Sequence, residues 1–183
     1  MAGHHLVLGA LVDFLTGKAI ADTHDERIRQ GVARVLVDQK GYGREDIRSG
    51  DKITVSCNEN KALIPLDFRI LLHERTAMIV KYGPGSILTR RRPALALSRL
   101  VAPYQVPIVV ITNGQNAEIL SGDSGRCLGE GLDAIPAKPQ LLRLIAVAGW
   151  KPLTKKRIEM ESRILYAFEI DGACPCDDTV CNL

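Results

Sequence analysis

No apolar run in this 183-residue sequence approaches the roughly 18 residues that a membrane-spanning helix needs. The most apolar stretch near the start, residues 5–15, is interrupted by Asp13 and has no lysine or arginine before it. It therefore does not match a secretory signal peptide. There is also no internal repeat and no low-complexity linker. These absences predict a soluble, cytoplasmic protein without a membrane partner.

The sequence also lacks a marked excess of one charge sign. It has 24 Lys and Arg residues against 21 Asp and Glu residues, a formal net charge of +3. This balance alone does not indicate a polyanionic partner, so the position of the charges has to decide. With 46% hydrophobic and 25% charged residues, disorder, collagen and coiled coils are excluded. The length suits one domain, with or without an appendage.

An even set of disulfide-forming cysteines is absent, because the chain has five cysteines and three of them crowd into its last ten residues. Cys174 and Cys176 are too close in sequence to pair well with each other, but they can share a metal ion with Cys181. The pattern predicts bound zinc or iron, or redox chemistry, in a reducing compartment. Reduced thiols without a metal are the alternative. The candidates for a fourth ligand are Cys57, Cys127, His4 and His5.

The hydrophobic pattern predicts one α/β or α+β domain built around a mixed sheet. Residues 6–21 favour two short strands around the Thr16-Gly17 turn. Thr23 and Glu26 have the spacing of a capping box that begins a helix, and Gly41 ends it. Further strands are expected at residues 53–57, 63–72, 76–82, 106–112 and 117–120. Further helices are expected at residues 88–102, 138–150 and 154–169.

The expected hairpin of residues 63–82 carries the most informative pattern. If residues 73–75 form its turn, the predicted cross-strand pairs are Asp67 with Lys81, Arg69 with Ile79, and Leu71 with Ala77. Asp67, Arg69, Ile79 and Lys81 then share one face. A carboxylate beside an ammonium group indicates either an ion pair or the remnant of a metal-dependent site that cleaves phosphate esters. The opposite face is expected to be the core side, with Leu66, Phe68, Ile70, Met78 and Val80.

Four motifs follow one another in a recognisable order: Glu26-Arg-Ile-Arg-Gln30, Pro65-Leu-Asp67, Lys81 with Tyr82-Gly-Pro84, and Val110-Ile-Thr-Asn-Gly114. Their order and spacing resemble the N-terminal domain of type I restriction enzyme R subunits, a member of the PD-(D/E)xK nuclease superfamily. The resemblance covers about residues 20–120. It implies a restriction-endonuclease-like mixed sheet flanked by helices. We expect a nuclease-like domain at residues 1–150 and a helical extension with a cysteine-rich tail at residues 151–183.

The resemblance also implies roles for individual residues. Glu26 would support the metal site, Asp67 would bind Mg²⁺, and Lys81 would orient or deprotonate the attacking water. The family has a second acid two residues before the lysine, but here that residue is Ile79, which offers no oxygen ligand. Either another carboxylate, Glu74 or Glu118, replaces it, or cleavage has been lost or severely weakened. The second alternative is favoured, because Glu74 lies in the hairpin turn, too far from Asp67.

Structural explanations compete with each of these roles. Glu26 has a sufficient role in its capping box, and Asp67 with Lys81 could be a simple cross-strand pair, with Arg69 further neutralising Asp67. Arg90, Arg91 and Arg92 precede a helix, where the dipole disfavours cations, so a phosphate ligand or plain solvation is expected there. Some PD-(D/E)xK nucleases hold an iron–sulfur cluster with one upstream and three C-terminal cysteines. The arrangement of Cys57, Cys174, Cys176 and Cys181 is similar to theirs.

The sequence therefore favours a nucleic-acid-associated protein of restriction or repair type, with a degenerate or weakly active Mg²⁺-dependent nuclease site. The partner would be nucleic acid, with DNA favoured, and a partner protein or a second copy of the chain is also compatible. One alternative is a non-catalytic module that keeps the nuclease fold to bind nucleic acid or protein. Another is a metal- or redox-responsive protein that acts through its cysteine tail. No G-x-x-x-x-G-K-[ST] loop is present, so any cleavage would not use a motor in this chain.

Overall fold

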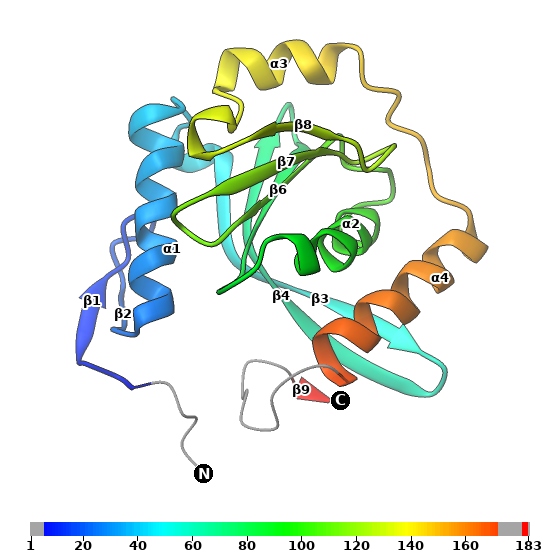
Figure 1. Cartoon of the computed structure of the whole chain (residues 1–183), viewed down its shortest axis with the longest axis horizontal. Helices are drawn as coiled ribbons and strands as arrows, with labels where there is room; N and C mark the ends of the chain where they lie inside the picture. Colours follow the sequence, from blue (N-terminus) through cyan, green and yellow to red (C-terminus); the bar gives the residue numbers. More distant parts are fainter. Residues whose placement is uncertain (1–5, 172–180, 183) are drawn as a thin grey trace.

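The computed structural model describes residues 6–171 and residues 181 and 182. It is an α/β fold with a mixed sheet between two layers of helices (Figure 1). The strand order is β3-β4-β5-β6-β7-β8, in which β5 and β6 are parallel and the other neighbours are antiparallel. The strands are β3 (Ile47–Cys57), β4 (Asn60–Leu72), β5 (Arg75–Tyr82), β6 (Ile108–Thr112), β7 (Ala117–Ser121) and β8 (Cys127–Glu130). The predicted fold class is confirmed.

The N-terminal segment follows the sequence prediction. β1 (Ala10–Val12) and β2 (Ala19–Ala21) form a separate antiparallel pair. The helix α1 (His24–Arg34) begins at Thr23, whose side chain accepts a 3.1 Å hydrogen bond from the Glu26 backbone N–H. It continues as a π-helical turn, Val35–Gln39, before Gly41 adopts φ +72°. Glycine reaches this left-handed conformation without steric cost, which explains why the helix ends there.

The helices divide between the two faces of the sheet, and each face has its own core. α1 and α3 (Lys138–Ala146) cover the first core, which contains Phe68, Ile70, Met78 and Val80. α2 (Arg91–Leu100) and α4 (Lys155–Tyr166) cover the second core, which contains Ile64, Leu66 and Ile79. Figure 1 shows α2 and α4 together on the side of the sheet away from α1. Among the described helices, none is both long and apolar enough to cross a membrane.

The strand β4 changes faces at Asp67. Leu66 packs into the second core and Phe68 into the first, although residues two apart in a regular strand point to the same side. On β3, Gly50 has φ +68° between the residues that pair with Phe68 and Leu66. A glycine in the left-handed region bends a strand pair. The bend places the Asp67 side chain where the two cores meet.

The hairpin register was predicted correctly in its middle and wrongly at its turn. Phe68 pairs with Val80, Arg69 with Ile79 and Ile70 with Met78, as expected. A bulge between Ile70 and Leu71 then shifts the register, so that Leu71 faces Thr76 and not Ala77. The turn is therefore two residues long, with His73 at φ 50° and Glu74 at φ 62°. Two positive φ values are what a tight two-residue hairpin turn requires.

Candidate functional site

Asp67 and Lys81 lie side by side on neighbouring strands, at the bend of β4 and near the end of β5. The Lys81 Nζ atom is 3.7 Å from Asp67 Oδ2, and both side chains are buried. The prediction that these two residues share a face is confirmed. The face itself was expected to be polar, whereas Ile79, two residues before Lys81, is 0% exposed in the second core. The sheet is covered on both sides, so an apolar side chain is buried there as well.

Both oxygens of the Asp67 carboxylate already have donors. Oδ1 accepts a 2.7 Å hydrogen bond from Arg29 Nε, and Oδ2 accepts a 2.9 Å hydrogen bond from the Tyr82 backbone N–H. Arg29 comes from α1, and its guanidinium lies 5.1 Å from the centre of the Tyr82 ring. Burial alone would lower the pKa of Arg29, but the charge of Asp67 and its hydrogen bond outweigh burial and raise it. Arg29 is therefore a firmly charged partner of Asp67.

Lys81 connects the sheet to the C-terminal helical extension. Its Nζ atom donates a 2.9 Å hydrogen bond to the Pro65 carbonyl oxygen and lies 3.9 Å from Glu169 Oε2. Glu169 belongs to the π-helical turn Ala167–Asp171 that follows α4. The ammonium group thus lies between two carboxylates from distant parts of the chain. Glu169 was not predictable from the sequence, because no local pattern indicates which strand the end of α4 reaches.

Glu26 lies on α1 beside Arg29, where the resemblance led us to expect an acid. Its Oε1 accepts a 2.8 Å hydrogen bond from Gln30 Nε2, and its Oε2 is 3.5 Å from Arg29 Nη1. Only the Thr23 half of the predicted capping box is found in the described part of the chain. A hollow of about 490 Å³ opens beside Glu26, Arg29 and Asp67, between α1 and the bend in the strand pair β3–β4. These three residues form one connected network along its wall.

Arg69 does not neutralise Asp67, contrary to expectation. Its Nη2 atom is 3.1 Å from Asp51 Oδ2 on the neighbouring strand. The strand β3 begins at Ile47, six residues before the predicted start, and so brings Asp51 alongside β4. Arg29, three positions after Glu26 on the same helix, takes the role that was assigned to Arg69. Its signal was the i, i+3 spacing, which places both side chains on one face of α1.

Neither of the acids considered as a replacement for the missing carboxylate reaches Asp67. Glu74 lies in the two-residue turn at the opposite end of β5 from Lys81. Glu118 lies on β7, two strands from Lys81, because Lys81 pairs with Ile111 and Ile111 pairs with Glu118. Glu118 also accepts a 2.6 Å hydrogen bond from Arg91 Nε. The structure therefore places both acids away from the Asp67 network.

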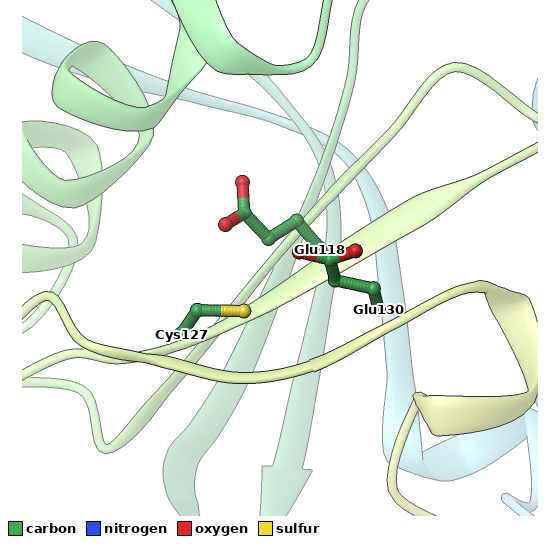
Figure 2. A group of neighbouring side chains, drawn as sticks. All are labelled: Glu118, Cys127 and Glu130. Atoms are coloured by element: carbon green, nitrogen blue, oxygen red, sulfur yellow. The ribbon is translucent and has the colours of Figure 1, made fainter.

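Glu118 belongs to a second cluster, with Cys127 and Glu130 of β8 (Figure 2). One potential ligand atom from each of the three side chains lies within 4.8 Å of the others. No other group of three such residues is found within residues 6–171, and the Asp67 network does not form one. Glu118 is the buried member, and the Arg91 guanidinium is its ion-pair partner. A cation at this cluster would have to compete with Arg91.

The arginines in the first turn of α2 meet buried carboxylates. Arg91 pairs with Glu118, and Arg92 Nη1 lies 2.6 Å from Glu161 Oε2 on α4. These partners relieve the conflict between the cations and the helix dipole that suggested a phosphate ligand. Phosphate binding by Arg90, Arg91 and Arg92 stays a prediction.

The cysteine prediction falls mostly on residues outside the described part of the chain. Cys174 and Cys176 lie there, and of Cys181 only the backbone is described, in the short strand β9 (Cys181–Asn182) that pairs with β4. Cys57 is half-buried at the end of β3, and Cys127 is exposed; both are free thiols. The zinc or iron–sulfur site stays a prediction.

Comparison with known families gives a match over the part of the chain that forms strands β3 to β8. Residues 24–136 match the family model described as type I restriction enzyme R protein N terminus. The matched segment runs from the start of α1 to the turn before α3 and contains Glu26, Asp67 and Lys81. α4 and the cysteine tail lie beyond it. Neither a curated protein nor a solved structure matches the chain.

Proposed function

Since the chain belongs to the family of type I restriction enzyme R protein N-terminal domains, we propose that it is a restriction-type, nucleic-acid-associated protein whose nuclease site no longer supports metal-dependent cleavage. DNA is the expected nucleic acid, because restriction enzymes act on DNA. The domain would then contribute binding and leave cleavage to another protein. This proposal joins the degenerate-site and the non-catalytic hypotheses that the sequence left open.

The observation that carries the proposal is the 2.7 Å hydrogen bond from Arg29 Nε to Asp67 Oδ1. Mg²⁺ is bound through one or two carboxylates, together with water and substrate phosphate. A cation at Asp67 would have to displace Arg29 and would still lie close to Lys81. At the position of the second acid in the family pattern, this chain has Ile79, which is fully buried among apolar side chains. These residues do not fit a divalent-metal site.

Glu169 does not repair the missing ligand. Its Oε2 atom is 3.9 Å from Lys81 Nζ, and the same ammonium group is 3.7 Å from Asp67 Oδ2. The positive charge of Lys81 between the two carboxylates compensates them in place of a metal ion. We therefore interpret Arg29, Asp67, Lys81 and Glu169 as a charge network that joins α1, the sheet and the C-terminal extension.

The test measures binding and cleavage of DNA by the same purified full-length chain. We expect a fluorescent duplex to be bound in EDTA, and Mg²⁺ should not strengthen this binding, because no metal ion would join the protein to the DNA. Supercoiled plasmid should stay intact in Mg²⁺ and in Mn²⁺. About 10 mM Mn²⁺ should leave the melting temperature unchanged, because the Asp67 network would not bind this ion. Nicking that requires a divalent ion and disappears in Asp67→Asn would contradict the loss of cleavage. Absence of DNA binding by the folded chain would contradict the proposal as a whole.

A metal- or redox-responsive role of the tail stays a separate hypothesis. Thiolates bind zinc and iron strongly, so Cys174, Cys176 and Cys181 are expected to retain metal through anaerobic purification. Elemental analysis of wild type and of a Cys176→Ser variant would decide it, since a specific site should lose its metal in the variant.

A further inference from the structure

Positive charge gathers at the start of the C-terminal extension. Residues 151–163 contain five lysines and arginines and two glutamates, an excess of three positive charges. This equals the net charge of the whole chain, +3, so the remaining residues are balanced. The mild total therefore hides a local basic segment. It lies on α4 and the turn before it, outside the segment that matches the family.

The excess continues where α4 packs on α2. The Glu161 carboxylate is 0% exposed and meets three guanidinium groups. Arg99 Nη1 lies 2.8 Å from Oε1, Arg157 Nε 2.7 Å from Oε1, and Arg92 Nη1 2.6 Å from Oε2. One negative charge thus faces three positive charges. This arrangement leaves two positive charges uncompensated at the junction of the two helices.

The three guanidinium groups differ in their access to solvent. The Arg99 side chain is 8% exposed and also donates to Gln105 Oε1 and to the Gly122 carbonyl oxygen. The side chains of Arg92 and Arg157 are 36% and 41% exposed, and Glu161 is the partner that each has in the described part of the chain. Burial lowers the pKa of Arg99, and the charges of Arg157 and Arg92 lower it further. An additional anion at Arg92 and Arg157 would relieve this repulsion.

We propose that the basic surface formed by Lys155, Lys156, Arg157 and Arg92 contacts the phosphate backbone of nucleic acid. Guanidinium groups donate two parallel hydrogen bonds to phosphate oxygens, and lysines add charge without a fixed geometry. From Lys155 to Glu169 the helical segment spans about 20 Å. Its far end touches Lys81, so a bound strand would run along α4 towards the Asp67 network. This inference rests on the proposed function, since it assigns the surface to the same nucleic-acid partner.

The experiment uses the full-length chain and a fluorescent DNA duplex of random sequence, titrated at several salt concentrations. The variant is Lys155→Gln with Lys156→Gln, two exposed lysines that make no ion pair among the described residues. The control is Lys18→Gln, an exposed lysine in the β1–β2 turn on the other side of the molecule (Figure 1). Each lost phosphate contact should lower the slope of log K against log salt by about 0.9, and the affinity about 8-fold at ~0.1 M salt.

The outcomes separate this inference from the proposed function. Weaker binding and a smaller salt slope in the double variant, with wild-type values for Lys18→Gln, would support it. Wild-type binding by the folded double variant would overturn the inference and leave the proposed function standing. No DNA binding by the wild type would overturn both. Tighter binding to phosphatidylserine vesicles than to DNA at equal ionic strength would assign the surface to a membrane and overturn the inference.

Discussion

Removal of the charge at Glu161 should destabilise the fold strongly, although Glu161 touches neither the sheet bend nor the hollow. Glu161→Gln keeps the size of the side chain and one acceptor oxygen, so packing between α2 and α4 is preserved. The negative charge that compensates three guanidinium groups is lost. Arg99 is then a buried cation without a counter-charge, and Arg92 and Arg157 repel it.

The contacts of each arginine set the expected magnitude. Removal of one partner from a buried ion pair costs about 3–5 kcal/mol, which applies to Arg99. Arg99 retains its 3.0 Å and 3.3 Å hydrogen bonds to Gln105 and Gly122. The loss of stability caused by its missing partner is therefore expected at the lower end of this range. Arg92 and Arg157 can turn to water, and exposed pairs contribute only about 0–1 kcal/mol each. We expect Glu161→Gln to lower the free energy of unfolding by about 3 kcal/mol.

Urea unfolding, followed by circular dichroism and by the fluorescence of Trp150, the single tryptophan, measures this loss. The matched control is Glu159→Gln, an exposed glutamate on the same helix, which should change stability by less than about 0.5 kcal/mol. The slope of free energy against urea should stay the same for all three proteins. A loss below about 1 kcal/mol in Glu161→Gln would refute the view that this carboxylate stabilises three convergent arginines.

Three further outcomes follow from burial and charge. Burial alone would raise the pKa of Glu161 and of Asp13, but hydrogen bonds lower both, and at Glu161 the arginine charges lower it further. The folded state therefore binds fewer protons than the unfolded state, and the stability that is present above about pH 4.5 should fall on acidification. Thermal melts should show this fall, and it should be less steep in Glu161→Gln. Ile79→Glu, which buries an unpaired carboxyl, should cost several kcal/mol in urea unfolding against ~1 kcal/mol for Ile79→Val, and equal losses would contradict the burial of Ile79. Gly122→Ala would place a Cβ against the Val106 carbonyl oxygen and should lower the melting temperature, whereas Gly31→Ala, in an open position on α1, should gain up to about 1 kcal/mol.

The strands and helices that were predicted correctly have strong local patterns. β5 and β6 are almost continuously apolar, and α1 combines a capping residue, helical spacing and a terminal glycine. β8 was missed because Cys127–Glu130 contains a glycine and little apolar periodicity. The start of β3 was missed because Arg48, Ser49 and Gly50 are poor strand formers in isolation. Pairing with β4 over its full length overrides these preferences.

The candidate site was predictable where one hairpin builds it and unpredictable where distant segments meet. Asp67 and Lys81 lie next to the Phe68–Val80 pair of β4 and β5, so counting along the sequence can bring them together. The contact of Lys81 with Glu169 depends on how α4 packs. Because the two residues are far apart in the sequence, no local pattern predicts this contact. The bulge between Ile70 and Leu71 could not be predicted from the sequence either. One additional residue in a strand next to the turn leaves the pattern of apolar residues there unchanged.

The packing of α4 has a consequence for where this domain ends as a folding unit. Leu165 of α4 is 0% exposed in the second core, with Ile164 and Tyr166 packed beside it. The family match stops at residue 136, before any of these side chains. A fragment cut at that point would keep α2 but lose α4, and so leave the part of the second core that α4 covers open to water. During synthesis, the sheet can therefore complete its second core only after the last helix has left the ribosome, and until then the exposed strands need protection from aggregation.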